Sequence, residues 1–334
     1  MKKGFLLAAI AAVAFTSCKT TEPVENKDKV VTGLITEDTY WYADTAYEMA
    51  GKVVVKEGAT LFIEAGTRVL ARDGQGSVST ALIIAQGGKI QAVGTSEAPI
   101  VFTSIYDNGT NLDESDQGLW GGIVVLGNAP ISADATPSLI EGIPANVDYG
   151  AYGGEDASDN SGILKYVSIR HAGTLLGDGN ELNGLTLGGV GSGTVIDNIE
   201  VVGNLDDGIE FFGGTVNASN LLVWAQGDDA FDIDQAYGGT ISNFVNVEGI
   251  DSDHALEIDG PEGTYSDSFV MENGILISTD GVECHFRDGA EGSVSFEGIA
   301  NVVADSGTDV TVTTLQDVVM PDFTWTFTYS KGKL

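Results

Sequence analysis

The chain has 334 residues, of which 49 are acidic and 15 are basic, and its formal net charge at pH 7 is −34. A charge of this sign and size repels nucleic acids and anionic lipid surfaces, so the sequence predicts no nucleic-acid partner. The 45 glycines against 7 prolines indicate a fold that is rich in tight turns.

The N-terminus has the features of a secretory signal. Lysines follow Met1, and an apolar run from Phe5 to Phe15 is too short to span a bilayer. The tetrapeptide Phe15-Thr16-Ser17-Cys18 resembles the lipobox of bacterial lipoproteins, which implies lipidation of the Cys18 thiol and outer-membrane lipid as a partner. We therefore predict a signal peptide over residues 1–17 and a polar tether over 18–31; plain secretion with an incidental cysteine is the alternative.

The segment from residue 53 to residue 102 consists of short apolar stretches separated by glycines. Apolar residues at alternate positions, in stretches too short for helices, are typical of β-strands. They predict the first coils of a β-solenoid, with strand residues Val53, Val55, Leu61, Ile63, Val69, Leu82, Ile84, Ile90, Val93 and Ile100 to Phe102. Two polar stretches, residues 106–118 and 128–162, interrupt the pattern and are expected to loop out of the stack.

From residue 193 to residue 293 the sequence repeats in units of about 22 to 26 residues, which is the period of a solenoid. Each unit carries a Gly-Thr or Gly-Ser turn, a small-x-acidic-apolar tetrad and an asparagine, which is Asn198, Asn220, Asn243 or Asn273. Parallel strands this close in sequence can pair only if coils stack on one another. We predict an all-β, single-domain, right-handed parallel β-helix with inserted loops over residues 32–303. Cys284 is expected inside it, as a small apolar side chain.

The last segment, residues 304–334, has aromatic residues at alternate positions. They are Phe323, Trp325, Phe327 and Tyr329. We predict one aromatic strand that caps the exposed end of the solenoid.

The repeat also aligns acidic residues. The neighbours of Glu210, Asp232, Glu257 and Glu283 are expected to face inward, so these four carboxylates should form one outward column. At a coil spacing of about 4.8 Å, adjacent charges repel by roughly 3 kcal/mol at an effective dielectric constant of about 20. Either Ca²⁺ offsets this repulsion, or the acids are solvated and guard against aggregation. The predicted calcium ligands are Asp207, Asp229, Asp232, Asp234, Asp253, Glu257 and Asp259.

Two enzymatic alternatives remain open. Asp206-Asp207-Gly208 and Asp228-Asp229-Ala230 are similar to the paired aspartates of polygalacturonase-type hydrolases, although the sequence lacks that family's Gly-His-Gly and Arg-x-Lys segments. A polysaccharide lyase would need a base, for which the scattered candidates are Arg170, His171, His254, His285 and Arg287. The histidines lack the spacing of a zinc motif, so Ca²⁺ is the one cofactor predicted.

Trp224 is a candidate for ligand binding. It falls at an outward strand position, where an exposed indole could stack on a sugar while the acidic residues Glu210, Asp232, Glu257 and Glu283 accept hydrogen bonds from its hydroxyls. The alternative is a tryptophan shielded by an inserted loop.

Several motifs in combination carry a family resemblance. They are Val55-Lys56-Glu57-Gly58-Ala59-Thr60-Leu61, Leu119-Trp120-Gly121-Gly122-Ile123, Gly153-Gly154-Glu155-Asp156, Asn183-Gly184-Leu185-Thr186-Leu187-Gly188-Gly189 and Asp207-Gly208-Ile209-Glu210-Phe211-Phe212-Gly213-Gly214. From about residue 32 to residue 290 the chain resembles a family of Bacteroidota envelope lipoproteins. The resemblance implies a right-handed β-helix and a lipid-anchored position at the outer membrane, and it brings no activity with it.

We therefore expect a non-enzymatic, lipid-anchored binding or adhesion protein of the cell envelope, with a glycan or an envelope protein as its partner and calcium as a stabiliser. The alternative is a carbohydrate-active β-helix enzyme that uses the corner aspartates.

Overall fold

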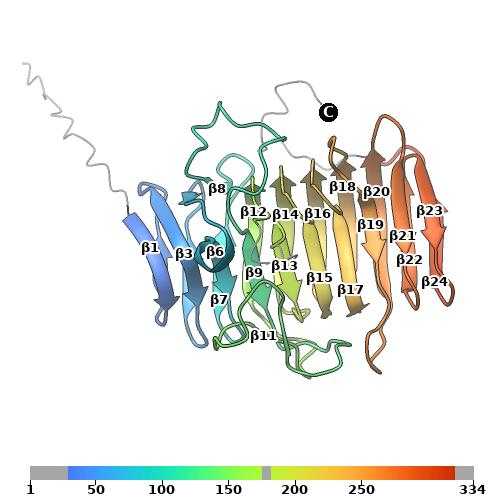
Figure 1. The fold of residues 1–334 in the computed structure, drawn as a ribbon, viewed down its shortest axis with the longest axis horizontal. Coiled ribbons are helices and arrows are strands. Elements are labelled where there is room, and N and C mark those ends of the chain that lie inside the picture. The colour runs from blue at the N-terminus through green and yellow to red at the C-terminus, as the bar shows by residue number, and fades with distance from the viewer. Residues whose placement is uncertain (1–28, 175–181, 320–334) are drawn as a thin grey trace, which may run out of the picture.

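The computed structural model describes residues 29–174 and 182–319, and over these residues the chain folds as a parallel β-helix (Figure 1). This confirms the predicted fold class. The strands are β1 (Lys29–Ile35), β2 (Thr39–Trp41), β3 (Tyr47–Val55), β4 (Thr60–Ile63), β5 (Arg68–Ala71), β6 (Ala81–Ile84), β7 (Lys89–Val93), β8 (Ile100–Ser104), β9 (Ile123–Leu126), β10 (Ser138–Leu139), β11 (Ala151–Tyr152), β12 (Gly162–Arg170), β13 (Leu185–Gly188), β14 (Val195–Val202), β15 (Ile209–Gly214), β16 (Asn217–Trp224), β17 (Phe231–Tyr237), β18 (Thr240–Val247), β19 (His254–Ile258), β20 (Phe269–Ile277), β21 (Val282–Phe286), β22 (Glu291–Glu297), β23 (Ala300–Ala304) and β24 (Asp309–Thr314). One short 3₁₀ turn covers Gly76–Val78.

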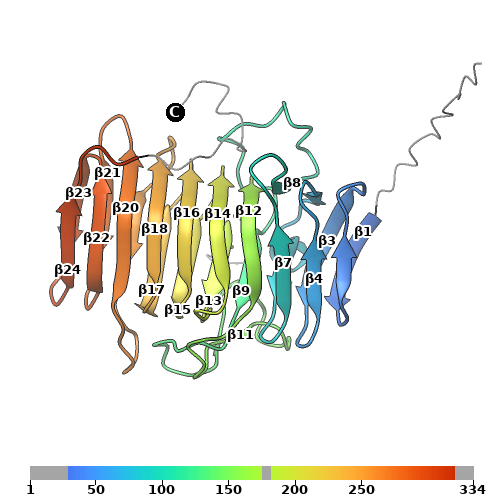
Figure 2. The same cartoon turned by 180° about the vertical axis from the view of Figure 1, so that it is seen from behind.

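The coils have three faces, each a ladder of parallel strands that runs the length of the stack (Figures 1 and 2). Face 1 contains β6, β9, β13, β15, β17, β19, β21 and β23. Faces 2 and 3 share the long strands: the first halves of β12, β14, β16, β18 and β20 lie on face 2 and their second halves on face 3. Strands β23 and β24 continue the stack beyond residue 303.

The asparagine column forms the bend between faces 2 and 3. Asn198, Asn220, Asn243 and Asn273 all have φ between 55° and 58°, the left-handed conformation that asparagine tolerates better than most residues. The Asn243 side-chain amide donates to Asn220 Oδ1 at 3.1 Å, and the Asn220 amide donates to Asp197 Oδ1 at 2.8 Å. The corner is therefore stabilised along the axis by side chains as well as by the backbone.

The core is the continuous interior of the coils. Inward residues of face 1, such as Phe211, Phe231, Leu256 and Phe286, are fully buried, as the alternation of apolar and polar residues predicts. Cys284 is also buried and free. Burial of these side chains, without a disulfide in the described part of the chain, supplies the main stabilisation.

Both predicted insertions leave the stack. In Figure 1 the first lies above the upper ends of the strands and the second below their lower ends. One lies between β8 and β9, and the other, between β9 and β12, carries the small antiparallel pair β10–β11. Ile131, Ile140 and Tyr152 of the second insertion pack on the outward residues Ile83 and Val124 of face 1. The outside of face 1 is thus apolar and covered over the early coils.

Three of the predictions concern residues outside the described ranges. The signal peptide with Cys18, most of the tether and the aromatic strand at 323–329 therefore stay predictions. Within the described ranges, no helix is long and apolar enough to cross a membrane.

Candidate functional site

The candidate site is the outside of face 1 over β15, β17 and β19, together with the corner that leads into these strands. We call it the acidic flank and define it by Asp207, Glu210, Asp229, Asp232 and Glu257. In the parallel ladder Glu210 lies opposite Asp232, and Asp232 lies opposite Glu257, as predicted. Close stacking of the coils requires the glycine at position 208, two residues ahead of Glu210. A Cβ on Gly208 would lie 2.6 Å from the carbonyl oxygen of Ala230.

The predicted position of Glu283 at the end of this column is wrong. Glu257 lies opposite His285, which is two positions beyond the predicted partner Glu283. Glu283 instead lies opposite His254. Asp259, which follows β19, forms an ion pair with Arg287. The coil from Glu257 to His285 is 28 residues long, two more than the 26 from Glu257 to Glu283, and a bulge between His254 and Leu256 shifts the start of β19 by one more residue.

Three carboxylates of the flank form its buried centre, namely Asp207, Glu210 and Asp232. One oxygen of each lies within 4.8 Å of the others. Asp207 and Glu210 are each only 7% exposed, so the expectation of solvated acids is wrong for them. Glu210 accepts a hydrogen bond from the Asn183 amide, and Asp207 Oδ1 accepts one from the backbone N–H of Asp229 at 2.9 Å.

This centre lacks a positive counter-charge. Within residues 29–174 and 182–319, no lysine, arginine or histidine forms an ion pair with Asp207, Glu210 or Asp232. Burial raises the pKa of all three carboxyls well above the usual range, and the neighbouring carboxylates raise it further. Asp232 Oδ1 and the Asn183 Oδ1 are buried without a hydrogen-bond partner. The centre therefore favours either protons or a bound cation.

The edges of the flank are better compensated. Asp229 is 2% exposed, and its Oδ1 lies 2.7 Å from His254 Nδ1. Burial, with the Glu257 charge, raises the pKa of Asp229 to about 7, although His254 opposes the shift. Burial lowers the pKa of His254, but the Asp229 charge and hydrogen bond outweigh it, so that this pKa is raised overall. Arg287 forms ion pairs with Glu257 and Asp259.

The remaining predicted metal ligands lie at the rim of the flank. Asp253 is exposed, with its carboxylate 3.8 Å from His254 Nδ1. Asp234 and Asp259 line an open groove of about 350 Å³ with Glu262 and Arg287. Burial and the charge of Glu262 raise the pKa of Asp234 to about 7. These residues therefore extend the negative surface around the centre rather than forming part of it.

The enzymatic alternatives find less support in this geometry. Oxygens of Asp206, Asp207 and Asp228 lie within 4.8 Å of one another, closer than the roughly 6.5–9.5 Å between the carboxyls of an inverting glycosidase. Asp207 and Asp229 are also buried, which leaves little access for a glycosidic bond. Of the candidate lyase bases, Arg170 ends β12 and His171 follows it. The intervening coils separate both from His254, His285 and Arg287.

Trp224 is not an exposed platform, and the structure agrees with the alternative of a tryptophan shielded by an inserted loop. The residue is outward on face 3, but it is only 4% exposed and packs with Val202, Leu222 and Val247. It lines a pocket of about 330 Å³, to which the first insertion contributes Glu114 and Gln117. The argument for an open aromatic platform that stacks on a sugar therefore loses its basis.

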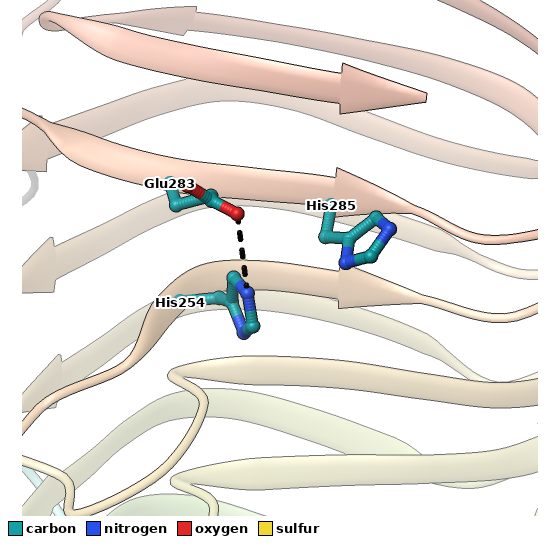
Figure 3. Close-up of side chains that lie close together, drawn as sticks. All are labelled: His254, Glu283 and His285. Atoms are coloured by element: carbon teal, nitrogen blue, oxygen red, sulfur yellow. Dashed lines mark ion pairs between the residues drawn. The ribbon is translucent and has the colours of Figure 1, made fainter. Parts of the chain in front are cut away.

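Sequence reasoning missed one constellation. His254, Glu283 and His285 come together on the outside of β19 and β21, beside the acidic flank (Figure 3). Their spacing of 29 to 31 residues matches no zinc motif, because stacked coils bring together residues about one coil apart. Their outward positions in successive repeats are the one signal that could have suggested it.

Comparisons with known proteins add the following. Residues 33–317 match the family described as a pectate-lyase-like β-helix domain. No curated protein matches the chain. A solved structure titled "Crystal structure of Agl-KA catalytic domain" is similar at 12% identity with a TM-score of 0.34, over 82% of this chain and 62% of that one. The chain thus spans about 62% of the length of that structure.

Proposed function

This chain belongs to the family of pectate-lyase-like β-helix domains, and on that scaffold we propose a non-enzymatic binding protein whose acidic flank holds a hard divalent cation, with calcium as the preferred ion. The ion binds at Asp207, Glu210 and Asp232, and Asp229 and Glu257 complete the negative surface around it. The bound cation stabilises the later coils and gives an otherwise repulsive face one defined structure.

The single observation that carries the proposal is the convergence of the buried Asp207 and Glu210 with the half-buried Asp232, whose Oδ1 is itself buried, with no basic partner in the described part of the chain. An ionised carboxylate in a poorly solvated place is costly unless it is paired or coordinates a metal. The three carboxylates together carry six oxygens, which approaches the roughly six to eight oxygens that Ca²⁺ takes. Oxygen-only ligands of this kind suit calcium better than a transition metal.

Calcium titration of the purified protein tests the proposal. We expect saturable Ca²⁺ binding by calorimetry and a higher melting temperature with calcium than with chelator. The variants Asp232→Asn and Glu210→Gln should each weaken calcium binding by at least about tenfold, which is about 1.4 kcal/mol. In chelator the same variants should be at least as stable as the wild type, because each removes a buried charge from a repulsive group.

Glu272→Gln is the matched control, since Glu272 is an exposed acid on the outside of face 2 that hydrogen-bonds Ser242. It should bind calcium as the wild type does. If calcium does not change the melting temperature, the proposed calcium site is wrong. If the protein instead degraded a polysaccharide and lost this turnover in Asp207→Asn and Asp229→Asn, the hydrolase alternative would replace the binding function.

The proposal places the protein at the outer membrane through a lipid on Cys18. The support is the lipobox-like sequence that ends at this residue. Fractionation of cells that express the wild type or Cys18→Ser tests the anchor. The wild type should sediment with membranes and the variant should not, and equal sedimentation of the two would contradict it.

A further inference from the structure

A bulge and two short strands bring two imidazoles and a carboxylate together on the outside of face 1. His254 begins β19, and the register irregularity that follows it places it opposite Glu283 of β21. His285 lies two residues further along β21, on the same outer face as Glu283, while Val282, Cys284 and Phe286 face the core. In Figure 3 the Glu283 carboxylate and the His254 ring point toward one another, and the His285 ring lies beside them.

The distances are close to those of a metal site. His254 Nε2 lies 3.6 Å from Glu283 Oε1, and the centroids of the two imidazole rings are 5.7 Å apart. One ligand atom of each of the three residues lies within 4.8 Å of the others. Ligands of a tetrahedral ion with bonds of about 2.0–2.1 Å are separated by roughly 3.3 Å. Small side-chain rotations on these exposed strands are therefore sufficient to close the site.

Each histidine is oriented by a second carboxylate. Asp229 Oδ1 lies 2.7 Å from His254 Nδ1, and Asp305 Oδ1 lies 3.3 Å from His285 Nε2. This leaves His254 Nε2 and His285 Nδ1 as the ligand nitrogens. Histidines that bind metals characteristically donate their other ring N–H to a carboxylate, which fixes the tautomer and makes the ligand nitrogen more basic. These two histidine–carboxylate contacts support a metal site independently of the distances among His254, Glu283 and His285.

We propose that His254, Glu283 and His285 bind a zinc-class divalent metal ion, with Asp229 and Asp305 as positioning residues. Two imidazoles and one carboxylate are a donor set that zinc accepts and that calcium, which takes oxygen ligands, does not. Glu283 is 40% exposed at its side chain, so the remaining coordination position opens to solvent and takes water or an external ligand. This site is separate from the calcium centre at Asp207, Glu210 and Asp232, and metal binding here does not depend on calcium binding there.

Metal titration of the full-length protein in excess calcium tests the site. We expect one equivalent of Zn²⁺ to bind, and Co²⁺ to bind with the visible spectrum of a four-coordinate nitrogen and oxygen site. Glu283→Gln and His285→Ala should each weaken Zn²⁺ binding more than tenfold, and Asp305→Asn by about tenfold or more. Asp280→Asn, which changes the charge of an exposed acid nearby, should bind as the wild type does.

The competing account is a plain ion pair between a protonated His254 and Glu283. It predicts no saturable zinc binding by the wild type, or binding that His285→Ala leaves unchanged, and either result overturns the proposal. Circular dichroism of each variant in chelator verifies its fold. Calcium binding measured on the same samples should be kept in His285→Ala and lost in Asp232→Asn. The two proposals can thus fail separately.

Discussion

At the scale of single residues, the acidic flank shows how burial changes the meaning of a charged side chain. An aspartate in water is a solubilising group, but Asp207 and Glu210 have lost most of their contact with solvent. Each needs a compensating group, and within residues 29–174 and 182–319 these groups are the Asn183 amide for Glu210 and the Asp229 backbone N–H for Asp207. Hydrogen bonds of this kind stabilise one carboxylate each but do not cancel the repulsion between neighbours.

Asn220 gives a prediction at this scale. Its φ of 56° costs an alanine about 1–2 kcal/mol, and its side chain forms two hydrogen bonds along the corner, each worth about 0.5–1.5 kcal/mol. We expect Asn220→Ala to lower the free energy of unfolding by about 2–5 kcal/mol. Urea denaturation followed by circular dichroism measures this change.

Asn220→Gly separates the two causes. Glycine adopts the positive φ freely but cannot form the hydrogen bonds, so this variant should be more stable than the alanine variant by about 1 kcal/mol. If the alanine variant were as stable as the wild type, neither the backbone conformation nor the asparagine ladder would matter for the corner.

At the scale of elements, the same face of the solenoid carries two different surfaces. Over β6 and β9 the outside of face 1 is apolar, and the second insertion covers it with Ile131, Ile140 and Tyr152. Over β15, β17 and β19 the outward positions become acidic. The transition falls where Asn183, just before β13, reaches Glu210. The early coils thus serve stability, and the later coils carry the candidate sites.

The bulge at the start of β19 is the element that distinguishes the two candidate sites. Without it Ala255 would lie opposite Glu283 in place of His254. With it, His254 lies opposite Glu283, while His285 takes the place opposite Glu257. The extra residue in β19 therefore adds an imidazole beside Glu283 and creates a mixed nitrogen and oxygen ligand set.

At the scale of the whole molecule, the net charge of −34 works against the compact state. Several buried acids also destabilise the folded state when they are ionised, because burial raises their pKa. For Asp229 and Asp234 the pKa rises to about 7 from the ordinary 3.8. A raised pKa in the folded state means that the folded chain holds more protons than the unfolded chain between these values. Stability is then lost as the pH rises through this window.

We therefore expect the melting temperature in chelator to fall as the pH is raised from about 4 to about 7.5. A loss of about 1 kcal/mol corresponds to roughly 2–4 °C in a chain of this order of size. Calcium should reverse the fall at the upper end of this range, because it replaces protons on Asp207, Glu210 and Asp232, whose pKa is also raised, and offsets the negative charge beside Asp229. Differential scanning calorimetry with and without calcium measures both effects. A melting temperature that rises with pH in chelator would contradict the raised pKa values.

A structural feature could be predicted from the sequence where it depends on interactions between residues that are close along the chain. The alternation of Phe231, Asp232 and Ile233 fixes which side chains face the core, and asparagine at a corner fixes a left-handed bend, because both depend on neighbouring residues alone. Repeats of nearly constant length then require stacked parallel coils. The fold and the alignment of Glu210, Asp232 and Glu257 could therefore be predicted from the chain.

Tertiary structure alone decided the burial of Trp224, Asp207 and Glu210, the place of Glu283, and the meeting of His254 with His285. Burial depends on what covers a face, and register depends on the length of each coil and on a local bulge. Contacts between coils join residues about one repeat apart, and a shift of two positions exchanges one ligand for another. The sequence encodes these outcomes only through the packing of the whole stack.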